Sequence, residues 1–226
     1  MRVRDSVAVT TGASSGIGRT TALAFARTGR AVVPAARREE ALGNVSSLLG
    51  AVAQPYTPAY GMPKHAVRAQ SAGLRQKLPL DRGVCTVPPG TIDTPLFGHA
   101  ADHTGRKAVA TPTVHSPERV AQTTVGLARR PRRGAVAGPM GPSTAPRSRF
   151  MPGTGERMTA HHTDRTHLSR TESAPAGHGN LHVPVPGEGA VHGGWGGRRR
   201  TAIRRLTTAV LPARAVAGVA HRARIR

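Results

Sequence analysis

The sequence predicts one α/β domain followed by a C-terminal extension. Its 226 residues are enough for a domain of this class and a further segment. Near the N-terminus, an apolar strand-like segment, a glycine-rich turn and a helical pattern follow one another directly. Further along, short apolar segments alternate with more helical patterns. Strands that alternate with helices in this way are typical of a parallel sheet with helical crossovers.

The N-terminal elements can be placed from their apolar patterns. Residues 5–12 form the first strand and its turn, and residues 17–28 form a helix with one apolar face. Gly29 ends this helix, because glycine readily adopts the conformation that follows a helix C-terminus. Residues 31–36 form the second strand, and the helix that begins after it stops at Leu42.

The second half of the domain repeats the alternation. Ser116 and Pro117 are typical of a helix start, because serine caps free N–H groups and proline suits the first helical position. A turn-rich loop is expected where prolines and a glycine cluster. The remaining predicted elements are strand 43–47, helix 59–78, strand 83–87, loop 88–95, helix 117–129 and strand 134–138.

The composition changes after residue 138. Residues 139–200 are rich in Gly, Pro, Ser, Thr, His and Arg and lack an apolar period, which predicts a largely irregular or disordered segment. A short basic amphipathic helix is expected at residues 201–211, where a proline then ends it. The chain therefore divides into an α/β domain at 1–138 and a tail at 139–226.

The net charge of +22 admits two interpretations. A strongly basic chain can bind nucleic acid or an anionic membrane, here through the tail and its run Gly196–Arg200. The plainer interpretation is a composition rich in Arg, Ala, Gly and Pro without such a partner. Scattered arginines and an aromatic content of only 3% favour the plainer interpretation, because few rings are present to stack on bases.

The cysteine, membrane and metal signals exclude several classes of protein. Cys85 is the only cysteine, so an intramolecular disulfide is excluded, which fits a cytoplasmic protein. An uncharged apolar run of about 18 residues is absent, so no transmembrane helix is expected, and residues 1–5 do not resemble a signal peptide. Three histidines lie close to Asp164, but without ordered flanks they predict no metal site. These histidines are His161, His162 and His167.

The glycine-rich turn at residues 11–18 is the first candidate binding site. It stands between a strand and a helix, where glycines let the backbone approach a dinucleotide phosphate and the helix start offers free N–H groups. About 20 residues further on, Arg37 and Arg38 suit the 2′-phosphate of NADP, whereas an acidic residue would suit NAD. The alternative for this pair is a solvated basic cluster at a strand end.

A second motif makes the glycine turn more specific. Tyr60 and Lys64 are four residues apart, so a helix places them on one face. Ser47 precedes Tyr60 by thirteen residues, and residues 89–94 read Pro-Gly-Thr-Ile-Asp-Thr. With these motifs, residues 5–138 resemble the short-chain dehydrogenase/reductase family. The resemblance implies a Rossmann-like, doubly wound parallel sheet that binds NAD(P) at the carboxyl ends of its strands.

The resemblance also implies a role for each matching residue. Tyr60 would exchange a proton with a carbonyl or alcohol substrate, and Ser47 would orient that substrate. Lys64 would lower the pKa of Tyr60 from about 10 and bind the nicotinamide ribose. NADP is the expected cofactor, with NAD less favoured, and a homo-oligomer is compatible with the family. The implied cofactor-binding residues are Gly12, Ser14, Ser15, Gly16, Ile17, Gly18, Arg37, Arg38, Tyr60, Lys64, Pro89, Gly90 and Thr94.

One part of the family pattern is absent. Only 41 residues separate Gly18 from Tyr60, where three strand–helix steps of about 30 residues each are expected. Strands 3 and 4 are therefore missing, with a join near Leu42–Gly43, and so is the Asn of the catalytic group. Strand 4 would separate the strand before the glycine turn from the strand that carries Ser47. Three functions stay open: an NADP-dependent oxidoreductase, an internally deleted remnant without enzyme activity, and binding of nucleic acid or an anionic membrane through the basic tail.

Overall fold

The computed structural model describes most of the predicted domain and part of the tail. The basic pair Arg37–Arg38, the helix expected to stop at Leu42 and the helix expected at 201–211 lie outside the described residues. The described residues are 7–10, 12–29, 31–34, 43–78, 83–137, 152–183 and 189–196.

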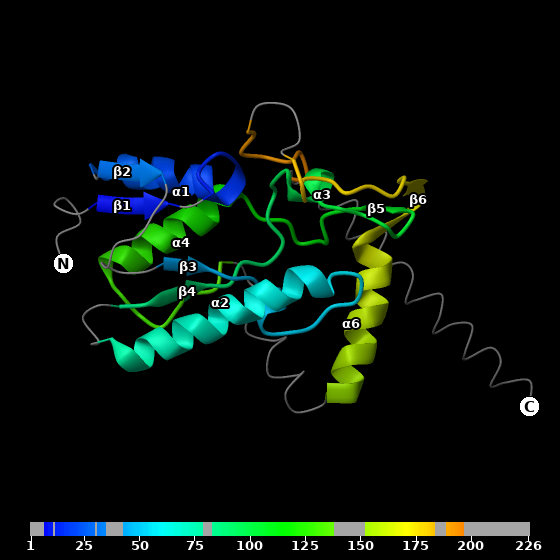
Figure 1. Cartoon of the computed structure of the whole chain (residues 1–226), viewed down its shortest axis with the longest axis horizontal. Helices are drawn as coiled ribbons and strands as arrows, with labels where there is room; N and C mark the ends of the chain where they lie inside the picture. The colour runs from blue at the N-terminus through cyan, green and yellow to red at the C-terminus, as the bar shows by residue number, and fades with distance from the viewer. Residues whose placement is uncertain are drawn as a thin grey trace, which may run out of the picture.

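The helices and strands of the domain agree closely with the sequence prediction. The predicted helix from Pro117 to Arg129 is confirmed, with Ser116 at its N-cap, although the Ser116 side chain makes no capping hydrogen bond. Two short elements, α3 and β5, were not predicted. In chain order the elements are β1 (Val7–Thr10), α1 (Gly16–Ala26), β2 (Ala31–Pro34), β3 (Gly43–Val45), the 3-10 turn η2 (Leu48–Gly50), α2 (Pro58–Lys77), β4 (Cys85–Val87), α3 (Leu96–His99), β5 (Arg106–Ala108), α4 (Pro117–Arg129), α6 (Pro152–Thr166) and β6 (Leu168–Ser173) (Figure 1).

Two parallel strand pairs form the centre of the domain. β1 pairs with β2, with Val7 opposite Ala31, and β3 pairs with β4, with Gly43 opposite Cys85. Residues 134–137 form isolated parallel bridges to β4 and the residues after it, where the last strand is predicted. The parallel pairing confirms the α/β class.

The two parallel pairs do not form one continuous sheet. Among the described residues, no strand or bridge connects β1–β2 to β3–β4. Of the expected doubly wound sheet without strands 3 and 4, the structure shows small parallel strand pairs with helices, and these pairs do not join in this part of the chain. Figure 1 shows α4 between the two pairs, and α4 packs against α1 on one side and against β3 and β4 on the other. Among the described residues, helix packing rather than strand pairing therefore connects the two parallel pairs.

The strand β1 is buried on one face only. Ala8 packs with Phe25 of α1 and Val125 of α4. Val9, whose side chain points to the opposite face, is 38% exposed, although a doubly wound sheet covers both faces. In the described part of the chain, the β1–β2 pair therefore behaves as a one-sided layer.

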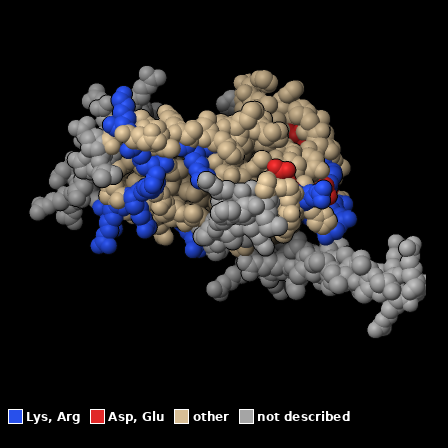
Figure 2. Space-filling model, turned by 90° about the horizontal axis from the view of Figure 1, so that it is seen from below, with Lys and Arg blue, Asp and Glu red and all other residues tan. Residues whose placement is uncertain are grey.

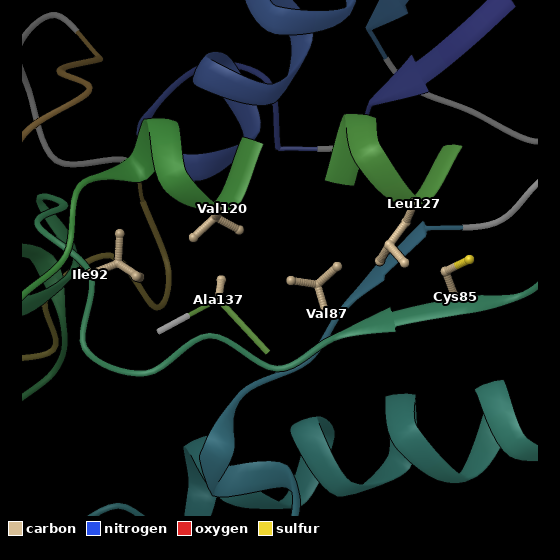
Figure 3. Packing of buried hydrophobic residues seen from close by; sticks show 6 residues of the cluster. All are labelled: Cys85, Val87, Ile92, Val120, Leu127 and Ala137. Atoms are coloured by element: carbon tan, nitrogen blue, oxygen red, sulfur yellow. The ribbon is translucent and has the colours of Figure 1, made fainter. Parts of the chain in front are cut away.

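The main core lies between α4 and the β3–β4 pair. Its side chains come from β4, the loop after it, α4 and the stretch at 134–137, and Figure 3 shows them pointing toward one another. Val87 of β4 and Val120 of α4 are fully buried, at 0% exposure. The cluster consists of Cys85, Val87, Ile92, Val120, Leu127 and Ala137.

Truncation of Val120 tests this core. We expect Val120→Ala to lower the free energy of unfolding by about 2 kcal/mol, because two buried methyl groups are lost and a cavity remains. Gln122→Ala is the matched control, since Gln122 is an exposed residue of the same helix and such changes stay within about 0.5 kcal/mol. Urea unfolding measures both, and equal values for the two variants would contradict the packing described above.

The tail is more regular than its composition predicts. Residues 152–173, expected to be irregular, form α6 and β6, and β6 pairs antiparallel with β5. Arg106 of β5 connects this strand to both α6 and β6. Its guanidinium donates to Asp164 Oδ1 of α6 at 2.7 Å and to the Ser169 carbonyl of β6 at 3.0 Å. These partners are distant in sequence, so no local sequence pattern predicts the pairing of β5 with β6.

Within the described ranges, none of the helices has the length and apolar character needed to cross a membrane.

Candidate functional site

The glycine turn leads from β1 into α1 as the sequence predicts. Gly12 and Gly16 both have positive φ angles, of 65° and 50°, which glycine adopts without strain. A Cβ on Gly16 would also lie 3.2 Å from Cγ2 of Thr94, so a second chain segment approaches the turn closely. Gly16 is therefore required both by its own conformation and by this contact.

The loop after β4 joins the two halves of the site. Its Thr94 is buried against Gly16, at the start of α1. Its Pro89 is buried too, and the Pro89 carbonyl accepts a hydrogen bond of 3.0 Å from the Leu48 N–H. Because Leu48 follows Ser47, this loop runs from the end of β3 to the glycine turn.

The three predicted catalytic residues are close together. Ser47 follows β3, and its side chain is hydrogen-bonded to that of Tyr60 on α2. Lys64 lies one helical turn further on, with Nζ 5.5 Å from the centroid of the Tyr60 ring. The Lys64 ammonium donates to the Val45 carbonyl at 3.4 Å. The Ser47 hydroxyl oxygen also accepts the Leu49 N–H at 3.1 Å, which fixes the serine at the start of η2.

Backbone contacts hold α2 against the end of β3. The Ser46 hydroxyl donates to the Lys64 carbonyl at 2.9 Å. Gly50 of η2 packs so closely that a Cβ there would lie 2.6 Å from the same carbonyl oxygen. These contacts set the position of the helix that carries Tyr60 and Lys64.

Burial disfavours the charged forms of both Tyr60 and Lys64. It raises the pKa of the Tyr60 phenol above its ordinary value, and the hydrogen bond with Ser47 lowers that pKa only in part. Burial also lowers the pKa of the Lys64 ammonium. The expected lowering of the Tyr60 pKa is therefore not met in this structure, because desolvation is the largest influence on the phenol and raises its pKa.

A pH titration tests the raised pKa of Tyr60. The difference in phenolate absorbance between wild type and Tyr60→Phe should show a midpoint above the ordinary 10.0. Ser47→Ala should move this midpoint higher, because the hydrogen bond that lowers the pKa is lost. Since the folded-state pKa exceeds the unfolded one, this phenol also makes the free energy of unfolding fall as pH rises above 10.0. A midpoint at or below 10.0 would contradict the burial.

The other predicted cofactor-binding residues lie around the glycine turn. Gly12 and Ser14 are exposed, and Ser15 is the N-cap of α1 without a side-chain capping hydrogen bond. Ile17 packs against the main core, and Gly90 approaches the Leu48 side chain. No metal-binding group of three His, Cys, Asp or Glu side chains occurs in the described part of the chain.

Sequence reasoning missed one segment that meets the glycine turn. The Gly16 N–H donates to the carbonyl of Ala190 at 3.0 Å, although residue 190 belongs to the predicted irregular tail. The available signal was local composition, because four glycines and the chain's single tryptophan stand at 189–196.

Comparison by sequence gives no relative: no family model and no curated protein matches the chain. The ligand-free aldohexose dehydrogenase of Thermoplasma acidophilum matches in structure with a TM-score of 0.48 and 17% identity, covering 60% of this chain and 94% of that chain. A short-chain dehydrogenase from Burkholderia cenocepacia J2315, in complex with NADP, matches with a TM-score of 0.55 and 16% identity, covering 68% of this chain and 97% of that chain. This second likeness shows the fold. The chain has a short-chain dehydrogenase-like fold.

The short-chain dehydrogenase-like fold explains why the candidate residues gather where they do. In open α/β folds, ligands bind outside the carboxyl ends of the parallel strands. The glycine turn follows β1, Ser47 follows β3 and the loop with Thr94 follows β4, so all three stand at carboxyl ends. The arrangement can therefore bring a bound ligand next to the Tyr60 phenol.

Proposed function

We propose that the chain binds NADP(H) and transfers hydride between it and a carbonyl or alcohol substrate. The observation that carries the proposal is the convergence of Ser47, Tyr60 and Lys64 at the end of β3. The loop from Pro89 to Thr94 then links this point to Gly16 at the start of α1. A hydride-transfer site requires the proton-donating residues and the glycine turn to lie near each other, whereas unrelated motifs have no such requirement.

The residues present fit a dinucleotide at the glycine turn. A Cβ on Gly16 would meet the Thr94 side chain in a tight contact of 3.2 Å. The first turn of α1 provides backbone N–H groups and the positive end of the helix dipole. Arg37 and Arg38 are proposed to bind the 2′-phosphate of NADP. Bound NADPH would supply the hydride.

The chain's own groups would handle the proton. The raised pKa keeps the Tyr60 phenol protonated, so in the reductive direction it can donate to the oxygen of a carbonyl substrate. The Ser47 hydroxyl stands beside the phenol and would orient that oxygen. Lys64 contributes positive charge one helical turn away, which favours the phenolate left after proton transfer.

The competing candidate is a remnant that has lost turnover. The separation of β1–β2 from β3–β4 favours it, because the glycine turn and Ser47 then belong to different strand pairs. A displacement of about 1 Å between reacting groups can reduce a rate on the order of a hundredfold. A remnant of this kind can still bind the cofactor.

Titration of the purified full chain with NADPH, followed by fluorescence, tests the proposed function. Saturable binding together with turnover of a carbonyl panel supports the oxidoreductase, whereas binding without turnover supports the remnant. Absence of saturable NADPH binding would contradict the proposed cofactor binding for both candidates.

A third candidate, binding of nucleic acid, is favoured by a basic surface. Figure 2 shows most of the visible Lys and Arg side chains toward one end of the molecule, and a smaller group beside acidic side chains toward the other. The exposed basic residues here are Lys77 at the end of α2 and, at and after the end of α4, Arg129, Arg130, Arg132 and Arg133. Arg75 of α2 donates to the Arg133 carbonyl at 3.4 Å, so the C-terminal ends of the two helices lie near each other. We expect the affinity for duplex DNA to fall steeply as the salt concentration rises. We also expect the double variant Arg132→Glu/Arg133→Glu to bind the duplex more weakly than wild type. No binding at low salt would end this candidate.

A further inference from the structure

Residues 189–196, here called the strap, lie across the start of α1. The Gly16 N–H donates to the Ala190 carbonyl at 3.0 Å. The Arg19 guanidinium donates to the Gly189 carbonyl in the same stretch. Two donors at the N-terminal turn of α1 are therefore already paired, and both are paired with backbone oxygens.

The other end of the strap is held by the loop after β4. The buried carboxylate of Asp93 accepts the Gly193 N–H at 3.1 Å and the Trp195 N–H at 2.7 Å. His192 stands between two carboxylates, with Nδ1 at 3.4 Å from Asp93 Oδ2 and Nε2 at 3.1 Å from Glu118 Oε1. Hydrogen bonds to a charged group are among the stronger ones in proteins, so Asp93 is the main anchor.

Glycine lets the strap lie this close. A Cβ on Gly189 would collide with the Ser14 carbonyl, and a Cβ on Gly193 would collide with the Thr94 carbonyl. Beyond them, the Trp195 ring packs edge-on against Phe97, with ring centroids 5.6 Å apart. The strap thus contacts the glycine turn at one end and the Thr94 loop at the other.

We propose that the strap is an autoinhibitory segment that must leave the glycine turn before NADP binds. The inference rests on the proposed function, because it concerns regulation of the same site. The Gly16 N–H cannot serve the Ala190 carbonyl and a phosphate oxygen together. The strap also lies against the Ser14 and Thr94 carbonyls, so it contacts two separate segments of the proposed cofactor site.

Two substitutions that add a single methyl group each should open the strap. Gly189→Ala/Gly193→Ala places a Cβ against a backbone carbonyl at both contacts, whereas Gly153→Ala is the matched control, since a Cβ there meets nothing within 4 Å. A site that is free only a tenth of the time binds about tenfold more weakly than the open site. We expect the double variant to bind NADP⁺ about tenfold more tightly than wild type and the control.

Trp195 gives a second readout that does not depend on activity. It is the only tryptophan of the chain, so fluorescence excited selectively at tryptophan reports on the strap alone. We expect acrylamide to quench Trp195 more strongly in the double variant, and more strongly in wild type after NADP⁺ is added. His192→Ala, which removes the side chain between Asp93 and Glu118, should show the same direction of change in both measurements.

The outcomes separate this proposal from the proposed function. Equal NADP⁺ affinity in wild type and the double variant, or weaker binding in the variant, overturns autoinhibition and leaves cofactor binding intact. Absence of NADP⁺ binding in every variant, the opened one included, overturns the proposed function and the inhibitory role with it. If NADP⁺ does not change the acrylamide quenching of Trp195 in wild type, the proposal that the cofactor displaces the strap is also overturned.

Discussion

Tyr60→Phe is expected to reduce turnover of any carbonyl or alcohol substrate by about 10² to 10⁴-fold, the usual contribution of a general acid–base group. The phenyl ring keeps the packing of α2 but can neither donate nor accept the proton that reduction and oxidation require. Burial makes the loss severe, because a shielded site offers little water to replace the phenol. Steady-state rates with NADPH measure the effect, and NADPH binding should persist.

Tyr56→Phe is the matched control for this experiment. Tyr56 is the other tyrosine of the chain and is 52% exposed. Its hydroxyl donates to Asp164 Oδ1 at 3.4 Å. Its removal should leave the rate unchanged. If Tyr60→Phe turns over substrate as fast as Tyr56→Phe, Tyr60 is not the proton donor, even if the cofactor still binds.

Gly16→Ala is expected to weaken NADPH binding by about ten- to a hundredfold, corresponding to about 1.4 to 2.8 kcal/mol. At Gly16 the φ angle is 50°, where any residue with a Cβ is strained. The added carbon would also meet the Thr94 side chain at 3.2 Å, so the turn or the loop must move. Either movement displaces the N–H groups at the start of α1.

Gly153→Ala again provides the control, because Gly153 stands in the first turn of a helix, as Gly16 does, but has neither positive φ nor a close neighbour. Isothermal titration with NADPH measures the binding, and thermal unfolding measures any general loss of stability. Unchanged affinity in Gly16→Ala would show that the glycine turn is a structural feature without a role in binding.

The helices that carry the site could be predicted from the sequence because their signals are local. The spacing of Tyr60 and Lys64 places them on one face of α2, and the Ser-Pro pair at 116–117 begins α4. Ser47 could be linked to Tyr60 only through a resemblance, since twelve intervening residues leave its distance from the phenol undetermined. The structure supplies that contact.

Only the tertiary structure could decide whether the two parallel strand pairs join into one sheet. The short interval between Gly18 and Tyr60 indicates a gap but does not decide whether the neighbouring strands close it. They stay apart, because α4 packs against α1 and against β3 and β4. The direction of the Tyr60 pKa shift was missed for a related reason: a motif shows a charge nearby, whereas desolvation depends on everything packed around the phenol.

The sequence by itself determined the α/β class, the glycine turn and the Tyr60–Lys64 pair, because each depends on residues within a few turns of chain. Only the tertiary structure decided that β6 pairs with β5 and that the strap meets Gly16 and Asp93. A polar strand and a glycine-rich segment have no apolar period, so their positions come from partners far away in sequence. Those partners are backbone and carboxylate groups, which composition does not reveal.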